Sequence, residues 1–153
     1  MLTFVVAALA FQAPAGRRLS VARADTVVMN WSKAKPIHRA PDNPMKSVFT
    51  VEKATEDQIA ELGVKQWPTW STAGSAKYAV GVRSPLKVYD CNELSYIISG
   101  KMEIIPETTG EPVLVQAGDF ITFPDEFPCY WHVIEEINKH YFIYDQMGNP
   151  EYD

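Results

Sequence analysis

A carboxylate near the middle of the chain is the first candidate for chemistry. Glu93 opens a segment whose alternation is typical of a β-strand, and that alternation puts it on one face with Ser95 and Ile97. If this face is buried, the carboxylate needs a hydrogen-bonding partner. It could then act as a ligand, a general base or a substrate anchor, whereas an outward Glu93 would be an ordinary surface acid.

A thiol near the end of the chain is the second candidate. Cys129 alternates with Trp131, so an inward pair would place the sulfur beside an aromatic wall. A nucleophilic role requires a thiol pKa lowered by a nearby base or cation, which Lys87, Lys139 or His140 could supply. The simpler interpretation is a small buried side chain, as free cysteine commonly is.

Three consecutive polar residues offer two opposite arrangements. Lys139 and Tyr141 share one face of a predicted strand, and His140 lies on the other. An inward Lys139 and Tyr141 would give a ligand an anion anchor and a hydroxyl, whereas an outward Lys139 would be solvated beside a core tyrosine. The sequence leaves both arrangements open.

Short strands are expected to position these residues. The 11 Pro and 8 Gly argue against long helices and suit short strands joined by turns. We expect strands at residues 47–51, 77–83, 86–90, 93–98, 101–105, 112–116, 120–123, 129–134 and 139–144. Their regular spacing favours an all-β sandwich or barrel, and a small barrel has an interior lined by alternate residues. Trp67 and Trp70 precede most of these strands and are expected to pack against a barrel end.

One short helix is predicted ahead of the barrel strands. Thr55 to Gln58 form a capping box, in which the Thr55 hydroxyl accepts from the Gln58 backbone and Gln58 reaches back. Ile59 and Leu62 supply an apolar stripe, and Gly63 suits the C-terminal end. These signals predict a helix over residues 55–62.

Length and charge indicate one domain and argue against some classes of protein. A chain of 153 residues is typical of one domain, and its net charge of -5 argues against a nucleic-acid binder. No apolar run approaches the ~20 residues of a membrane-spanning helix. Residues 1–40 hold six basic residues and one acid, whereas residues 41–153 hold eight basic residues and eighteen acids. The chain therefore reads as a basic leader joined to an acidic domain.

The leader has the composition of a targeting segment. Residues 2–9 are mostly apolar and lead into Ala8-Leu9-Ala10, and residues 11–24 are rich in Arg and lack acids. Together they resemble the bipartite plastid presequences of diatoms and related algae, with secretion as the alternative. We expect a leader over residues 1–29, an extended arm over 30–46 that includes His38, and a domain over 47–153. Removal of the leader would leave no membrane segment. Two cysteines make no disulfide framework, and a reducing plastid would keep them as thiols.

Two motifs resemble those of the cupins. Glu93-Leu-Ser-Tyr-Ile-Ile-Ser-Gly100 fits the E-x6-G half of the first cupin motif, and Gly118-Asp-Phe-Ile-Thr-Phe-Pro124 fits the G-x5-P half of the second. The number of residues between the two motifs also fits. The stretch over roughly residues 60–145 is similar to small single-domain (RmlC-like) cupins related to the cupin domain of (S)-ureidoglycine aminohydrolase. The resemblance implies an all-β jelly-roll barrel, often with a divalent metal in its mouth.

The metal ligands of the family pattern are largely missing here. That pattern supplies two His before the Glu and a third after the Pro, and only Glu93 is retained. Leu86 and Val88, or Lys87 and Tyr89, occupy the first pair of positions, and Cys129 occupies the third. We therefore expect no metal cofactor and a pairing of Lys87 with Glu93, because an ammonium repels a divalent ion. If a metal binds, Glu93, Cys129 and a displaced His140 are its candidate ligands.

The resemblance implies a ligand pocket inside the barrel. Its expected lining residues are Lys87, Tyr89, Glu93, Cys129, Trp131, Lys139 and Tyr141. We expect a small polar or anionic metabolite to bind there. The alternative is a metal-dependent, aminohydrolase-like enzyme that acts on a ureido or carboxylate substrate. A structural role is also open. The apolar face of residues 94, 96 and 98, opposite Glu93, needs cover from the N-terminal arm or from a second subunit, which would make a homodimer.

Overall fold

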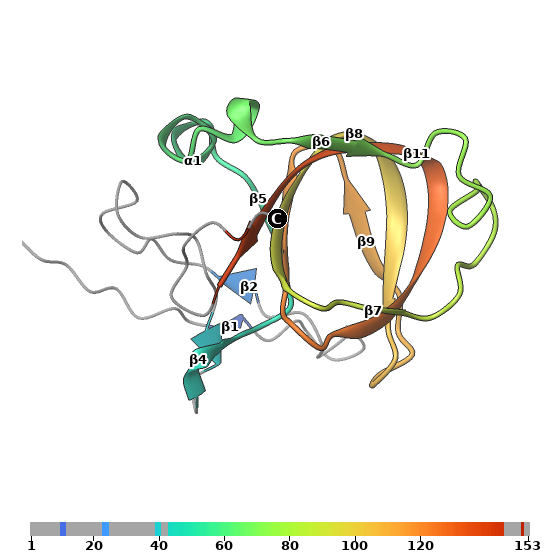
Figure 1. The fold of residues 1–153 in the computed structure, drawn as a ribbon, viewed down its shortest axis with the longest axis horizontal. Helices are drawn as coiled ribbons and strands as arrows, with labels where there is room; N and C mark the ends of the chain where they lie inside the picture. The colour runs from blue at the N-terminus through green and yellow to red at the C-terminus, as the bar shows by residue number, and fades with distance from the viewer. Residues whose placement is uncertain (1–9, 12–22, 25–38, 41–42, 146–150, 152–153) are drawn as a thin grey trace, which may run out of the picture.

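The computed structural model describes residues 10–11, 23–24, 39–40, 43–145 and 151 (Figure 1). Most of the predicted leader and arm, with His38, lies outside the described residues, so the targeting predictions stay predictions. The elements are β1 (Ala10–Phe11), β2 (Arg23–Ala24), β3 (Arg39–Ala40), β4 (Asn43–Ser47), β5 (Thr50–Lys53), α1 (Glu56–Glu61), a 3-10 turn η1 (Val64–Gln66), β6 (Thr69–Ser71), β7 (Lys87–Val88), β8 (Asn92–Pro106), β9 (Val113–Gln116), β10 (Asp119–Phe123) and β11 (Pro128–Tyr144).

One antiparallel sheet makes up most of the described chain. Its seven strands follow the order β5-β10-β8-β11-β6, with β9 also pairing with β8 and β7 with β11. Figure 1 looks into the barrel that this sheet forms. The buried core within it includes Ile97, Ile104, Ile121 and Val133. The predicted all-β barrel with one short helix is confirmed.

Two long strands of the barrel wall, β8 and β11, take the place of pairs of short strands that were predicted. The first part of β8 pairs with β10 and its second part with β9. In the same way β11 pairs first with β7 and then with β6, and with β8 over most of its length. The breaks predicted between residues 98 and 101 and between residues 134 and 139 are therefore wrong. The chain passes both places through shifts in strand register.

Gly100 explains why the first of these places is a bend and not a turn. Its φ of 99° lies in the left-handed region that side chains rarely adopt. On β11 the residues opposite are Glu136 and Ile137, so two residues face one, as in a β-bulge. The shift moves the inward side of β8 from Ile97, an odd position, to Met102, an even one.

The predicted strand over 77–83 is also wrong. This segment consists of turns, with one isolated bridge between Arg83 and His132. Gly81 has a φ of 81°, which interrupts an extended chain. Hydrogen bonds from the backbone N–H groups of Gly81 and Ser84 to β11 carbonyls still hold the segment against the barrel. Tyr78 is buried as a result.

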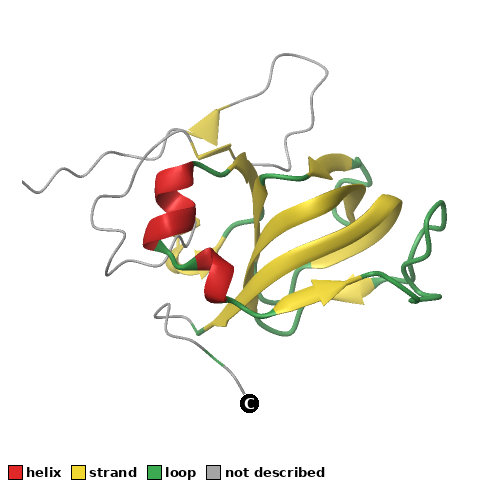
Figure 2. Ribbon diagram, turned by 90° about the horizontal axis from the view of Figure 1, so that it is seen from above, coloured by secondary structure: helices red, strands yellow, loops and turns green. Residues whose placement is uncertain are grey.

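The α-helix α1 lies against the outside of the barrel. Figure 2 shows α1 and η1 beside one end of the sheet. Ile59 and Val64 pack there in a second buried cluster with Leu94, Phe120 and Phe142. This packing covers much of the face that was expected to need an arm or a second subunit, although Ile98 remains exposed. The homodimer stays a prediction.

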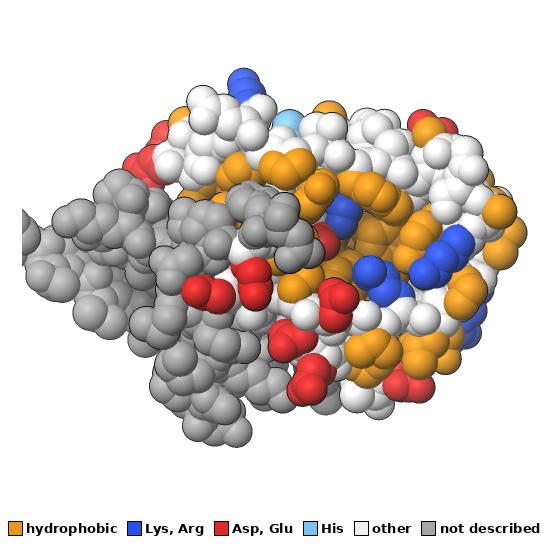
Figure 3. Space-filling model, in the orientation of Figure 1, with side chains coloured by type: hydrophobic (Ala, Val, Ile, Leu, Met, Phe, Trp, Pro, Cys, Tyr) orange, Lys and Arg blue, Asp and Glu red, His pale blue; other side chains and the backbone are white. Residues whose placement is uncertain are grey.

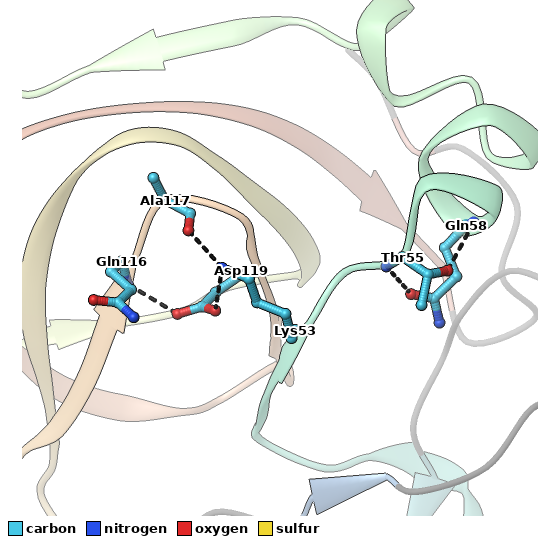
Figure 4. Close-up of polar contacts among 6 residues, drawn as sticks. All are labelled: Lys53, Thr55, Gln58, Gln116, Ala117 and Asp119. Atoms are coloured by element: carbon cyan, nitrogen blue, oxygen red, sulfur yellow. Dashed lines mark hydrogen bonds and ion pairs between the residues drawn. The ribbon is translucent and has the colours of Figure 1, made fainter.

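Local hydrogen bonds fix the helix and a neighbouring turn (Figure 4). The predicted capping box is present: Gln58 N–H donates to Thr55 Oγ1 over 3.2 Å, and Thr55 N–H donates to Gln58 Oε1 over 2.9 Å. In the turn before β10, the Asp119 carboxylate accepts from the backbone N–H of Gln116, while Lys53 donates to the Ala117 carbonyl. Within the described part of the chain, no helix is both long enough and apolar enough to cross a membrane.

Candidate functional site

A pocket opens at the mouth of the barrel. Its volume is about 320 Å³, which is within the range of small-molecule sites. Figure 3 shows a hollow lined by hydrophobic side chains, with basic and acidic side chains inside and beside it. The lining residues are Trp70, Tyr78, Lys87, Glu93, Trp131, Lys139 and Tyr141.

Strand register brings the charged side chains together. Glu93 and Ser95 share a face of β8, as the alternation predicted, and both point inward, as the cupin resemblance implied. Tyr141 pairs with Ser95 in the sheet and Lys139 pairs with Ile97, so β11 presents its odd residues to the same interior. His140 takes the opposite side, and its Nδ1 lies 3.0 Å from the Trp67 carbonyl oxygen. Of the two arrangements that the sequence left open, the structure therefore has the one with Lys139 and Tyr141 inside the barrel.

A buried ion pair lies on the pocket wall. Lys139 is 5% exposed and Glu93 9%, and the Lys139 ammonium donates to Glu93 Oε1. Ser95 Oγ donates to the same oxygen over 2.6 Å. Burial raises the pKa of Glu93, but the charge and hydrogen bond of Lys139, the Ser95 hydroxyl and the charge of Lys87 together lower it below its usual value. Glu93 is therefore a carboxylate at neutral pH. Its bonded partner is Lys139, where Lys87 was expected.

Aromatic rings surround the Lys139 ammonium. Its Nζ lies 5.4 Å from the ring centroids of Trp70 and Trp131 and 5.9 Å from that of Tyr141. Rings at such distances stabilise a cation through their negative faces. Trp70 and Trp131 also meet edge to face, with centroids 5.8 Å apart. The cation is thus held by one carboxylate, one hydroxyl and an aromatic enclosure.

Lys87 brings a second cation to the pocket. It lies on β7, and its Nζ is 4.4 Å from the centre of the Tyr89 ring. Among the described residues it forms no salt bridge, although its charge contributes to the lowered pKa of Glu93. Tyr89 was expected on the pocket lining but is buried behind it, stacked on Phe123. Burial, and then the charge of Glu93, raises the pKa of Tyr89, so its hydroxyl stays protonated.

Cys129 was also expected on the lining and is instead fully buried in the core. Burial raises the pKa of its thiol to about 12, which leaves almost no thiolate at neutral pH. Cys91 has a pKa of about 12 for the same leading reason, and both residues are free thiols. The simpler interpretation of Cys129, a small buried side chain, is the one that the structure supports.

Sequence reasoning missed two of the lining residues. Trp70 was expected to pack against the barrel end, but β6 pairs it with Lys139, which puts its ring on the pocket. Trp67 does pack outside, against Phe120 and Phe142. Tyr78 was placed on a strand that does not exist, so its direction could not be assigned.

Comparisons with known proteins agree with this architecture. Residues 59–141 match the model of the EutQ-like cupin domain. The chain belongs to this cupin family. The predicted jelly-roll class is confirmed with it. Among proteins with curated descriptions, none matches the sequence significantly.

Solved structures extend the comparison. A DUF861 family protein from Thermotoga maritima is 33% identical with a TM-score of 0.54, over 63% of this chain and 99% of that one. EutQ from Clostridium difficile is 16% identical with a TM-score of 0.41, over 74% and 79% of the two chains. A putative ethanolamine utilization protein Q from Salmonella typhimurium is 12% identical with a TM-score of 0.40, over 74% and 80%. The first of these supports the barrel fold of this cupin.

The residues of this cupin do not fit a divalent metal ion. Glu93 Oε1 is already bound by an ammonium and a hydroxyl. Cys129 is a protonated thiol with no exposed surface, and His140 faces the other side of the sheet. The three candidate metal ligands are therefore not brought together. No cluster of three or more His, Cys, Asp or Glu side chains suited to a metal occurs within the described ranges.

Proposed function

We propose that this cupin binds a small carboxylic acid or a similar polar anion in its barrel pocket, and that it does so without a metal ion. The observation that carries the proposal is the Lys87 cation, which forms no salt bridge within the described part of the chain. It lines a pocket whose internal ion pair, Lys139 with Glu93, is already neutral. Two ammonium groups against one carboxylate leave the pocket with an excess positive charge.

The surroundings strengthen the attraction for an anion. Aromatic side chains form much of the pocket wall, and charges interact more strongly where water is excluded. A lysine that binds a carboxylate forms a charge-assisted hydrogen bond, which is stronger than a neutral one. The volume of about 320 Å³ suits a small metabolite.

The alternative is a metal-dependent enzyme similar to (S)-ureidoglycine aminohydrolase, acting on a ureido or carboxylate substrate. Its chemistry would need a metal to activate water or to polarise the substrate. The Lys139 ammonium at Glu93 opposes a metal there, because two cations would compete for one carboxylate. We therefore favour binding in a lysine-based site.

Replacing Lys87 by methionine should weaken the binding of small carboxylates, such as lactate, by about tenfold or more, because it removes one charge-assisted hydrogen bond. Isothermal titration calorimetry of the full chain at low ionic strength measures this change. Lys77→Met is the matched control, since Lys77 also lies over a tyrosine ring, 5.2 Å from the Tyr78 centroid, but is exposed and is not among the lining residues. Equal losses in the two variants, or no binding by the wild type, would contradict the proposal.

A further inference from the structure

The two oxygens of Glu93 have different environments. Oε1 accepts both hydrogen bonds to this carboxylate, one from Ser95 and one from Lys139. No side chain or backbone group of the described residues donates to Oε2. Glu93 is 9% exposed, and it lines the pocket. The unpartnered oxygen therefore belongs to the small surface that Glu93 presents to the pocket.

The ionised oxygen Oε2 needs a hydrogen-bond donor that the described residues do not provide. A carboxylate is an acceptor with about four lone-pair sites, and leaving a buried charged group unsatisfied is costly. Lys139 directs its two hydrogen bonds to Oε1 and to Ser95 Oγ, and neither goes to Oε2. The donor has to come from water or from the bound molecule.

The pocket thus offers two complementary points of attachment. Lys87 is a cation without a salt bridge among the described residues, and Glu93 Oε2 is an acceptor without a donor. A plain carboxylic acid would satisfy the first and leave the second unmet. A ligand with a donor beside its carboxylate would satisfy both.

We propose that the ligand is a small acid that also carries a hydroxyl or amino group, with its carboxylate bound by Lys87 and its donor bound by Glu93 Oε2. This inference rests on the proposed function and adds the class of acid. Lys139 is then a positioning residue: it holds Oε1 and leaves Oε2 for the ligand.

Three acids of equal carbon count test the inference. Lactate carries a donor, propionate carries none, and pyruvate carries only an acceptor at the same carbon. Titrated into the full chain, lactate should bind about tenfold or more tightly than propionate, because hydrogen bonds to charged groups are strong. Pyruvate should bind more weakly than propionate, because its carbonyl oxygen would face a carboxylate oxygen.

Glu93→Gln should raise the affinity for pyruvate relative to that for propionate. The Lys139 ammonium has only donors, so it would take the amide oxygen, and the amide NH₂ would then lie where Oε2 was. The pocket would present a donor, and pyruvate should gain on both other acids. Should this variant fail to fold, the wild-type order of lactate, propionate and pyruvate still decides the matter.

The outcomes separate the two proposals. If lactate and propionate bind with equal affinity and Lys87→Met weakens both, acid binding stands and the donor inference is overturned. If none of the three acids binds to the wild type, both proposals fail. If pyruvate fails to gain on propionate in Glu93→Gln, the assignment to Oε2 is also overturned.

Discussion

Replacing Lys139 by methionine should destabilise the protein by about 3–5 kcal/mol at neutral pH, the usual cost of removing one partner from a buried ion pair. The variant would leave the buried Glu93 carboxylate with Ser95 as its one remaining donor among the described residues. Urea unfolding followed by tryptophan fluorescence measures the change. Removing both charges with Lys139→Met and Glu93→Leu should restore much of the stability, because an apolar pair needs no neutralisation.

The loss should depend on pH in a defined direction. In the wild type the pKa of Glu93 is lowered, so its stabilising contribution is present above the pKa of the unfolded chain and is lost as the pH falls through the folded value. Without the charge and the hydrogen bond of Lys139, the pKa of Glu93 should rise. Protonation would then remove the buried charge that destabilises the variant. The difference in unfolding free energy between the two proteins should therefore shrink as the pH falls.

Lys101→Met is the matched control for this prediction. Lys101 lies 3.6 Å from Glu135, but both side chains are substantially exposed, and surface pairs contribute about 0–1 kcal/mol. If Lys139→Met costs no more than Lys101→Met, the ion pair does not hold the pocket together as described.

Gly100→Ala should destabilise the protein by about 3 kcal/mol or more, from backbone strain and overpacking combined. A Cβ at this position would lie 2.8 Å from the carbonyl carbon of Glu136 and closer still to its oxygen. These are backbone atoms of the neighbouring strand, so no side-chain rotation relieves the clash. The two long strands would have to separate at this bend.

Gly110→Ala provides the comparison. Gly110 has a φ of 67°, and a Cβ there would meet no atom within 4 Å. Its replacement by alanine should lower the stability only through the strain of a left-handed backbone conformation, about 1–2 kcal/mol. Thermal unfolding of both variants by circular dichroism measures the contrast. Equal losses at the two glycines would show that the close approach of β8 and β11 at Gly100 is not a constraint.

Local signals in the sequence were sufficient for part of the site. Alternation placed Glu93 on one face with Ser95 and Ile97, the cupin motif favoured the interior for that face, and the capping box predicted the helix. These signals come from residues that are close together in the chain. The cupin motifs also predicted the fold that the family match confirms.

The rest of the site depends on contacts between distant segments. The face of Lys139 could not be chosen, because the second half of β11 is covered on both sides: Lys139 points into the barrel, and Phe142 packs beneath the helix. Strict alternation also fails along β8, where the inward parity changes at the Gly100 bend. Trp70 reaches the pocket only through its pairing with Lys139, which no local pattern encodes.

We propose that a lysine, and not a metal, provides the positive charge of this site. The most direct measurement is lactate titration into full-chain protein purified without chelator and again after dialysis against EDTA, with elemental analysis of both samples. We predict a substoichiometric content of manganese, iron and nickel, and the same affinity before and after chelation. A stoichiometric metal whose removal abolishes binding would contradict the claim and would place the metal-dependent enzyme first.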